Sequence, residues 1–259
     1  MQRIATVVKM GGVILAAPEV FKKLQPFIDD ILRDPKLASA GVIINCRELT
    51  PEEAIGSPGR DDFPLQKGKE KLMQAEIDGC SGQAYTDMPG NFSGSLQEAL
   101  TLPPTNNYQR AVIIAALNAA HRKMKPATPT IHCRDQGPGE CSEKLGQFIA
   151  EKYGNPRIAV IGLQPAMVEQ LARRFATRVF DLDPDNIGKG KYGVTIEASE
   201  PLWEQVEDWC DLFLVTGSSV VNGTIDPFLN RKKPVIFYGT TIAAPAELLG
   251  LKRFCPVSS

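Results

Sequence analysis

Apolar residues at three- and four-residue intervals form the first regular pattern of the chain, between Pro18 and Leu32. This spacing predicts a helix with one apolar face. Short apolar-rich runs at residues 41–48 and 71–78 are bounded by Gly, Pro and Asp, and residues 81–87 continue the second run or pair with it. These runs predict a small antiparallel sheet.

The segment from Thr105 to Met124 predicts a long helix, with Thr105 as its N-cap after two prolines. Alanines and branched residues fill its interior almost continuously, so we expect burial on more than one side. Residues 126–146, which follow, contain three prolines and several glycines, a composition typical of a linker.

From residue 147 onward, strand-like apolar runs alternate with helical segments. The runs IAVIG, LFLV and VIFY are continuously apolar, which is typical of parallel strands buried on both faces. Helices are expected at PAMVEQLARRF, PLWEQVEDW and TIDPFLNR. The predicted fold class is α/β: a small α+β domain at residues 1–125, a linker at 126–146, and at 147–259 a Rossmann-like parallel sheet with helices on both faces.

Composition narrows the classes of function. The 259 residues are 43% apolar and 23% charged, near the average of globular proteins. No stretch approaches the ~18 uninterrupted apolar residues of a membrane span, and 29 basic against 30 acidic residues leave no excess charge for binding nucleic acid. Lys9 interrupts the apolar N-terminal run, and six cysteines are too sparse for a disulfide scaffold, so a cytoplasmic location is predicted.

Ligands of a doubly wound sheet bind in the loops that follow the carboxyl ends of the strands. The first such loop contains Gly162 alone where a dinucleotide fingerprint has three glycines, so Gly162 is either a ligand contact or a plain strand-to-helix turn. Asp181 stands about twenty residues after the first strand, where Rossmann proteins often have a ribose-binding acid. Asp183 follows it, in a loop that lacks the Gly and Glu of an EF-hand, and a solvated charged loop is the alternative.

The loops after LFLV and VIFY are rich in glycine and small polar side chains. The first contains Thr216, Gly217, Ser218, Ser219, Asn222, Gly223 and Thr224, and the second contains Gly239, Thr240 and Thr241. Glycines let a ligand approach the backbone, hydroxyls donate hydrogen bonds, and the amides at a helix start favour an anion or carboxylate. Helix capping by Asn222 or Thr224 is the alternative. Together the two loops predict a binding pocket.

His132, Cys133 and Cys141 lie close together in the predicted linker and are candidate ligands of a divalent metal ion. Structural zinc sites normally use closer cysteine pairs and a fourth ligand, which Cys46, Cys80 or solvent would have to supply. Linker thiols without a metal are the alternative.

Familiar catalytic motifs do not occur in the sequence. It contains no GxSxG, HExxH or CxxC pattern, and its two histidines leave little for a catalytic triad. Whether the chain is an enzyme therefore stays open, and no cofactor is assigned beyond the divalent metal ion.

The segment DLFLVTGSSVVNGTID, followed by PVIFYGTTIAAPAELLG, resembles the Rossmann-like half of the putative heavy-metal chelation family, a family of unknown function. NNYQRAVIIAALNAAHR, which includes Asn118, resembles the companion domain of that family, similar in fold to the N-terminal domain of enolase. The resemblance implies an enolase N-terminal-like domain, a Rossmann-like domain and, between them, a site that binds a metal or a metal complex. Residues 56–68 and 132–141 have no characteristic counterpart in the family.

Two functions are compatible with these observations. The first is a cytoplasmic two-domain protein that binds a small anionic or metal-containing ligand in the interdomain cleft, as heavy-metal chelation or handling requires. The second is an enzyme that uses S-adenosylmethionine or a nucleotide in the Rossmann-like half, where Asp181 would hold the ribose hydroxyls. A homo-oligomer is compatible with both, and neither nucleic acid nor a membrane is an expected partner.

Overall fold

The computed structural model describes residues 17–34, 37, 43–68, 70–199 and 202–259. Its first half contains α1 (Glu19–Arg33), β1 (Ile43–Glu48), α2 (Pro51–Ile55), β2 (Lys71–Ile77), β3 (Cys80–Thr86), β4 (Phe92–Ser95), α3 (Leu96–Leu100) and α4 (Asn107–Met124). The strands form an antiparallel sheet in the order β3-β2-β1-β4. The predicted first helix, small sheet and long helix are confirmed, whereas Lys9 and the start of the first predicted strand lie outside the described residues.

Asn106, rather than Thr105, is the N-cap of α4. The Asn106 side chain accepts a hydrogen bond from the backbone N–H of Gln109 at 2.9 Å, while the Thr105 hydroxyl donates to the Gln109 side chain. The predicted cap was wrong by one residue. Asparagine is the better N-cap of the two because its side-chain oxygen satisfies a free amide of the first turn more effectively.

The second half is built around a larger sheet. Its elements are α5 (Gly137–Tyr153), β5 (Ile158–Ile161), α6 (Pro165–Ala172), β6 (Thr177–Asp181), β7 (Gly190–Lys191), β8 (Val194–Ala198), α7 (Trp203–Trp209), β9 (Leu212–Thr216), α8 (Ser219–Asn222), β10 (Val235–Tyr238), α9 (Ala243–Leu248) and β11 (Arg253–Phe254). The strand order is β11-β10-β9-β5-β6-β8-β7, and every pair is parallel except the β7–β8 hairpin.

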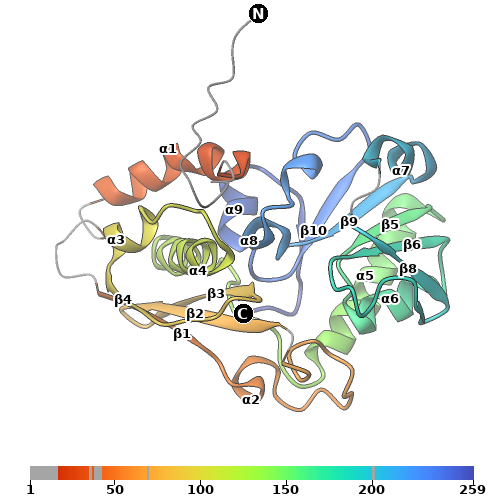
Figure 1. Ribbon diagram of the computed structural model, residues 1–259, viewed down its shortest axis with the longest axis horizontal. Coiled ribbons are helices and arrows are strands. Elements are labelled where there is room, and N and C mark those ends of the chain that lie inside the picture. Colours follow the sequence, from red (N-terminus) through yellow and green to blue (C-terminus); the bar gives the residue numbers. More distant parts are fainter. Residues whose placement is uncertain (1–16, 35–36, 38–42, 69, 200–201) are drawn as a thin grey trace, which may run out of the picture.

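Helices cover both faces of the larger sheet (Figure 1). Helices α5 and α6 pack on one face, and α7, α8 and α9 pack on the other, because alternate strand residues point to opposite sides. The predicted α/β class, with a small antiparallel sheet and a larger, mostly parallel sheet flanked by helices, is confirmed. No helix in the described part of the chain is both long and apolar enough to span a bilayer.

The prediction that residues 126–146 are a linker without regular structure was wrong for part of that segment. Residues 137–146 of the predicted linker are helical, because Pro138 occupies the first turn of α5, where its missing N–H costs nothing, and Leu145 packs against the sheet. The division of the chain into domains stays a prediction.

The segment TIDPFLNR does not form the predicted helix. Before this segment the chain makes the single turn α8, with Gly223 (φ 74°) as its C-cap, and within it a 3-10 turn forms at Asp226–Phe228. The Asp226 carboxylate accepts hydrogen bonds from the first two backbone N–H groups of α1, at 2.7 and 2.9 Å. This segment therefore caps a distant helix.

Helix α4 joins the two halves. Residues 111–121 of α4 are all buried, because the helix lies against the small sheet on one side and against α8 and α9 on another (Figure 1). The hydrophobic core of the small sheet continues through this helix into one face of the larger sheet. The predicted burial of α4 on more than one side is confirmed.

Asn118 supplies the polar connection within this apolar seam. Its side chain is fully buried, and its Nδ2 donates to the backbone oxygens of Gln83, Thr240 and Thr241 at 2.8, 3.3 and 3.2 Å. Its Oδ1 accepts from the backbone N–H of Ala244 at 2.8 Å. One amide thus satisfies backbone groups from both halves.

Gly82 lets β3 and α4 approach closely. A Cβ atom at this position would overlap the backbone of Ala115 and Ala119 in α4. We expect Gly82→Ala to lower the free energy of unfolding by at least about 2 kcal/mol, because backbone must move to admit the methyl group. Thermal and urea unfolding measure this loss.

The matched control is Gly139→Ala, a helical position in α5 where a Cβ atom meets nothing within 4 Å. Alanine should be neutral or slightly stabilising there, since it favours helix more than glycine does. Equal stability of Gly82→Ala and the wild type would contradict the close approach of β3 and α4.

Asn118→Ala should cost about 3 kcal/mol of unfolding free energy, because it leaves buried backbone groups of both halves without a partner. Chemical denaturation followed by circular dichroism measures the change. Asn155→Ala, at an exposed asparagine, should change stability little. A cost for Asn118→Ala as small as that of this control would refute the bridging role.

Candidate functional site

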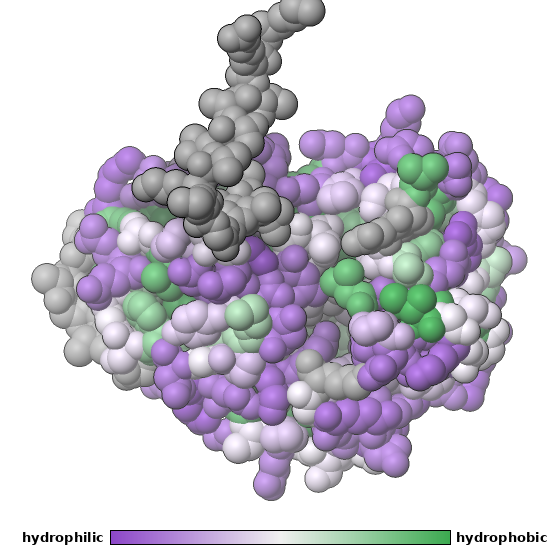
Figure 2. All heavy atoms as spheres, viewed as in Figure 1, coloured by the Kyte–Doolittle hydropathy of each residue, from purple (hydrophilic) through white to green (hydrophobic). Residues whose placement is uncertain are grey.

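A cavity of about 610 Å³ lies between the small sheet and the carboxyl edge of the larger sheet. On the face seen in Figure 2, hydrophilic side chains predominate, and hydrophobic residues gather over the half that holds the larger sheet. The cavity is lined by the loops that follow β5, β6, β8, β9 and β10, and by residues near the ends of β2 and β3. Strand β5 pairs with β6 on one side and β9 on the other, so the chain reverses its direction of winding there. Ligands of such sheets bind at this switch point.

Residues 56–68, called the strap below, cross from the small sheet to the far side of the cavity. Phe63 and Leu65 of the strap are buried, line the cavity and belong to a cluster that includes Ala166 of α6. Arg60 forms an ion pair with Glu169 of α6 at 2.6 Å. The strap therefore forms one wall of the site.

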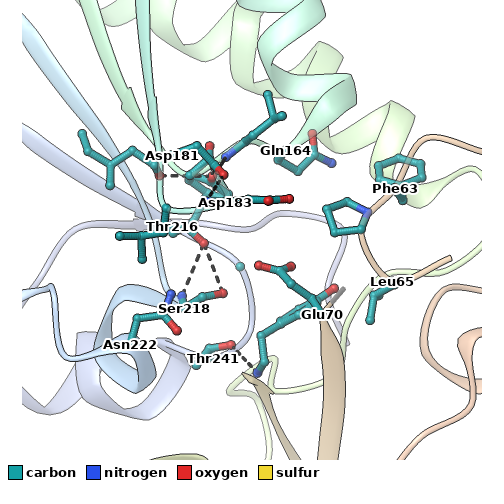
Figure 3. A pocket seen from close by; sticks show the side chains of 18 of the residues that line it. Phe63, Leu65, Glu70, Gln164, Asp181, Asp183, Thr216, Ser218, Asn222 and Thr241 are labelled. Atoms are coloured by element: carbon teal, nitrogen blue, oxygen red, sulfur yellow. Dashed lines mark hydrogen bonds between the residues drawn. The ribbon is translucent and has the colours of Figure 1, made fainter. Parts of the chain in front are cut away.

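The cavity is acidic. It is lined by four carboxylates and, among the residues that the structure describes, by no lysine or arginine; the carboxylates are Glu70, Asp87, Asp181 and Asp183. Figure 3 shows Glu70 and Asp183 pointing into the same space from opposite sides. Burial, reinforced by the charges of Asp181, Asp87 and Asp183, raises the pKa of Glu70 from its ordinary 4.5 to about 7.

The Asp181 side chain accepts hydrogen bonds from its own loop, after β6, and from the loop after β5. Its Oδ2 accepts from the backbone N–H of Leu163 at 2.8 Å, and its Oδ1 accepts from the backbone N–H of Asp183 and the side chain of Asn186 at 2.8 and 3.1 Å. These bonds use most of the acceptor sites of a carboxylate. Asp181 thus holds two strand-end loops together at the cavity.

Most of the predicted loop residues line the cavity. These are Gly162, Asp181, Asp183, Thr216, Ser218, Asn222, Thr224, Gly239 and Thr241. Figure 3 shows Thr216, Ser218, Asn222 and Thr241 on one side of it. Thr241 also accepts a hydrogen bond from the backbone N–H of Tyr85 at 3.0 Å, which ties the loop after β10 to β3.

Gly217, Ser219, Gly223 and Thr240 do not line the cavity. A Cβ atom at Gly217 would meet Ile242 of the next loop at 2.9 Å, and the Ser219 hydroxyl donates to the Thr216 carbonyl. These residues shape the loops. Asn222 is the last residue of α8, so it does not cap a following helix as the alternative interpretation required.

His132, Cys133 and Cys141 all line the cavity. The Nδ1 atom of His132 lies 3.2 Å from the Ala54 carbonyl, so it carries the proton, and burial lowers the pKa of His132 to about 4. Burial raises the pKa of Cys133 to about 12. Within the described residues, no group of three or more His, Cys, Asp or Glu side chains is arranged to hold a metal ion. The metal role of these residues stays a prediction.

A third thiol, which the sequence did not point to, joins this wall. Cys255 also lines the cavity, and the neighbouring Cys141 thiol and the charge of Arg253 lower the pKa of Cys255 despite its burial. The neighbouring Cys255 and burial raise the pKa of Cys141.

Sequence reasoning missed several cavity residues. Glu70 and Asp87 flank strands of the small sheet and gave no signal of facing the other half, and Cys255 lies far along the chain from Cys141. Tyr238 ends a predicted parallel strand, so the strand-end rule could have found it; its hydroxyl donates to the Gly162 carbonyl at 3.0 Å.

The fold and the site define a mixed α/β protein with an acidic cavity at the switch point of its larger sheet. Residues 147–250 match the model of the DUF364 family, described as "putative heavy-metal chelation". The C-terminal part of the chain is therefore similar to that family, and the resemblance expected from the sequence is confirmed. A search of curated proteins gives no match.

Solved structures of this family have a similar fold. A DUF364 protein of unknown function from Pyrococcus horikoshii has a TM-score of 0.54 and 18% identity, over 89% of this chain and 82% of that one. A second, from Desulfitobacterium hafniense, has a TM-score of 0.52 and 12% identity, over 89% of this chain and 84% of that one. These likenesses concern the fold.

The raised pKa of Glu70 predicts a pH-dependent stability. The folded state holds the Glu70 proton more tightly than the unfolded state, so its contribution is complete below about pH 4.5 and is lost as the pH rises through about 7. We expect Glu70→Gln to gain on the order of 2 kcal/mol relative to the wild type as the pH rises from about 5 to about 8. Thermal unfolding across this range measures the gain.

Glu76→Gln is the matched control, because Glu76 is an exposed glutamate on β2, the strand that follows Glu70. A pH-dependent gain of the same size in both variants would contradict the assignment to Glu70.

Proposed function

We propose that this protein binds a small metal-containing ligand in the cavity between its two sheets and serves in heavy-metal chelation or handling in the cytoplasm. The observation that carries the proposal is the set of four carboxylates around one cavity with no lysine or arginine in its described lining. The family of residues 147–250 supports the same class of function.

The negative charge of the cavity disfavours a free anion as the ligand. A phosphate or carboxylate ligand would meet the like charges of Asp87, Asp181 and Asp183 and would lack a cationic partner. Helix α8 offers little compensation, since it is a single turn. A ligand with net positive charge would instead neutralise the cavity and lower the pKa of Glu70.

Size favours a metal complex over a bare ion. The cavity of about 610 Å³ falls within the roughly 300–1,000 Å³ of small-molecule sites. The described residues contain no ready group of three metal ligands. A small chelator that supplies most of the metal's ligands, with the protein contributing carboxylate, hydroxyl and amide groups, fits both observations.

The rival function is an enzyme that uses S-adenosylmethionine or a nucleotide in a Rossmann-like second half. The strand order and the position of Asp181 at the end of β6 favour it. The hydrogen bonds of Asp181 to Leu163, Asp183 and Asn186 weigh against it, because a ribose would compete for the same oxygens.

Thermal-shift assays and calorimetry test the proposal with defined probes. These are Zn²⁺, Ni²⁺ and Cd²⁺ alone, the same ions bound to histidine, inorganic phosphate, ATP and S-adenosylmethionine. We expect the metal–histidine complexes to stabilise the protein most, by about 2.7 kcal/mol at 100 times the dissociation constant. Glu70→Gln should weaken their binding about tenfold, and Glu76→Gln should not.

Stabilisation by phosphate, ATP or S-adenosylmethionine without metal would refute the proposal, and stabilisation by ATP or S-adenosylmethionine would favour the rival function. Equal affinity of Glu70→Gln and the wild type for the metal complexes would move the site away from this cavity.

A further inference from the structure

The cavity has an apolar part as well as its carboxylates. Three segments supply large apolar side chains to it: the strap, the stretch from the end of β5 into α6, and the loop after β6. We call these side chains the apolar lining; they are Phe63, Pro64, Leu65, Leu163, Met167 and Leu182. Figure 3 shows Phe63 and Leu65 across the cavity from Thr216, Ser218 and Asn222. A bound ligand therefore meets hydroxyl and amide groups on one side and apolar side chains on another.

The members of the apolar lining differ in how much surface they leave free. Phe63, Leu65 and Met167 are at most 5% exposed, so they shape the cavity by packing into the protein core. Pro64 and Leu163 are half-buried, and Leu182 is 46% exposed. These last three are the apolar side chains that still have surface for a ligand to cover.

Leu182 stands between two acidic residues of the same cavity, Asp181 and Asp183. The Asp181 carboxylate accepts a hydrogen bond from the backbone N–H of Leu163 at 2.8 Å, which joins the loops that carry the two leucines. A single exposed leucine is ordinary on a protein surface. Leu182 differs because it lines the cavity together with Leu163 and the carboxylates, so a ligand bound there meets both charge and apolar surface.

Side-chain contacts hold the strap's share of the apolar lining in place. The Tyr192 hydroxyl donates to the Asp62 carboxylate at 2.8 Å, and Arg60 forms ion pairs with Asp62 at 2.7 Å and with Glu169 at 2.6 Å. An apolar surface that is already ordered spares the ligand the entropic cost of ordering it.

The cavity is larger than a metal ion and its inner ligands require. Six ligand groups of the size of a water molecule, about 30 Å³ each, occupy roughly 200 Å³. The cavity has a volume of about 610 Å³. More than half of it therefore remains for other parts of the chelator, and the apolar lining bounds part of that space.

We propose that the chelator of the bound metal complex carries an apolar group, which Pro64, Leu163 and Leu182 contact while the metal end lies among the carboxylates. This inference rests on the proposed function and names its ligand class, a positively charged metal complex with a hydrophobic body. Pro64, Leu163 and Leu182 are then the residues that determine specificity for the chelator rather than for the metal.

Calorimetric titration of the full-length protein with two matched complexes tests this inference. The probes are the equimolar Ni²⁺ complexes of diethylenetriamine and of N-benzyldiethylenetriamine. Both chelators donate three nitrogens to the metal and both complexes carry the same charge, so one benzyl group is the difference between them. We expect the benzyl complex to bind at least about tenfold more tightly, as an apolar group that enters a hydrophobic pocket does.

Variants locate the contact of the benzyl group. Leu182→Asn should lower the affinity ratio of the two complexes about fivefold, because a hydrated amide replaces an apolar contact. Leu163→Ala should also lower it. Leu202→Asn is the matched control, since Leu202 is 66% exposed and lies at the start of α7 without lining the cavity, and it should keep the wild-type ratio. Circular dichroism checks that each variant is folded, and the wild-type ratio needs no variant.

Equal affinity of the wild type for the two complexes would overturn this inference and leave the proposed function standing. A wild-type ratio in both Leu182→Asn and Leu163→Ala would overturn it as well, because the benzyl group would then bind elsewhere. If neither these complexes nor Ni²⁺–histidine bind, the proposed function fails, and this inference fails with it.

Discussion

The buried amide of Asn118 connects backbone from the small sheet with backbone from the loop and helix after β10. An apolar side chain at this position would leave those groups unpaired in a seam that water does not enter. Within the first half, Gly82 lets the α4 backbone approach β3 closely. Helix α4 is therefore held against the small sheet, and its Asn118 connects that sheet to the loop and helix after β10.

A fixed seam explains how the cavity tolerates its charge. Four carboxylates around one space repel each other, and a hinged protein would relieve that repulsion by opening. Here the core is continuous through α4, and burial of Glu70, reinforced by the charges of the three aspartates, raises the pKa of Glu70. Strongly shifted pKa values cluster at functional sites, and a positively charged ligand would gain a favourable interaction with these carboxylates.

The sequence predicted those parts of the structure that depend on local pattern. The apolar spacing of α1, the continuous apolar strands and the polar loops after β9 and β10 each carry their own signal. Pairings between distant segments carry no such signal: Asp226 caps α1, and Cys255 lines the same cavity as Cys141, only because the tertiary fold brings them together. Glu70 belongs to the same class, since nothing next to it in the chain indicates the aspartates across the cavity.

The strap is held to the cavity wall by contacts of another kind than those of the seam: an ion pair of Arg60 with Glu169, a hydrogen bond from the Tyr192 hydroxyl to Asp62, and apolar burial. Opening the seam would unpair Asn118 and expose the core around α4, whereas lifting the strap breaks the part-exposed ion pair of Arg60 with Glu169 and uncovers Phe63 and Leu65. Exposed ion pairs contribute about 0–1 kcal/mol, and two large apolar side chains roughly 1.5–3 kcal/mol each. Burial of apolar side chains therefore contributes more than charge to holding the strap on this wall of the cavity, whereas the seam depends on both a buried amide and a continuous core.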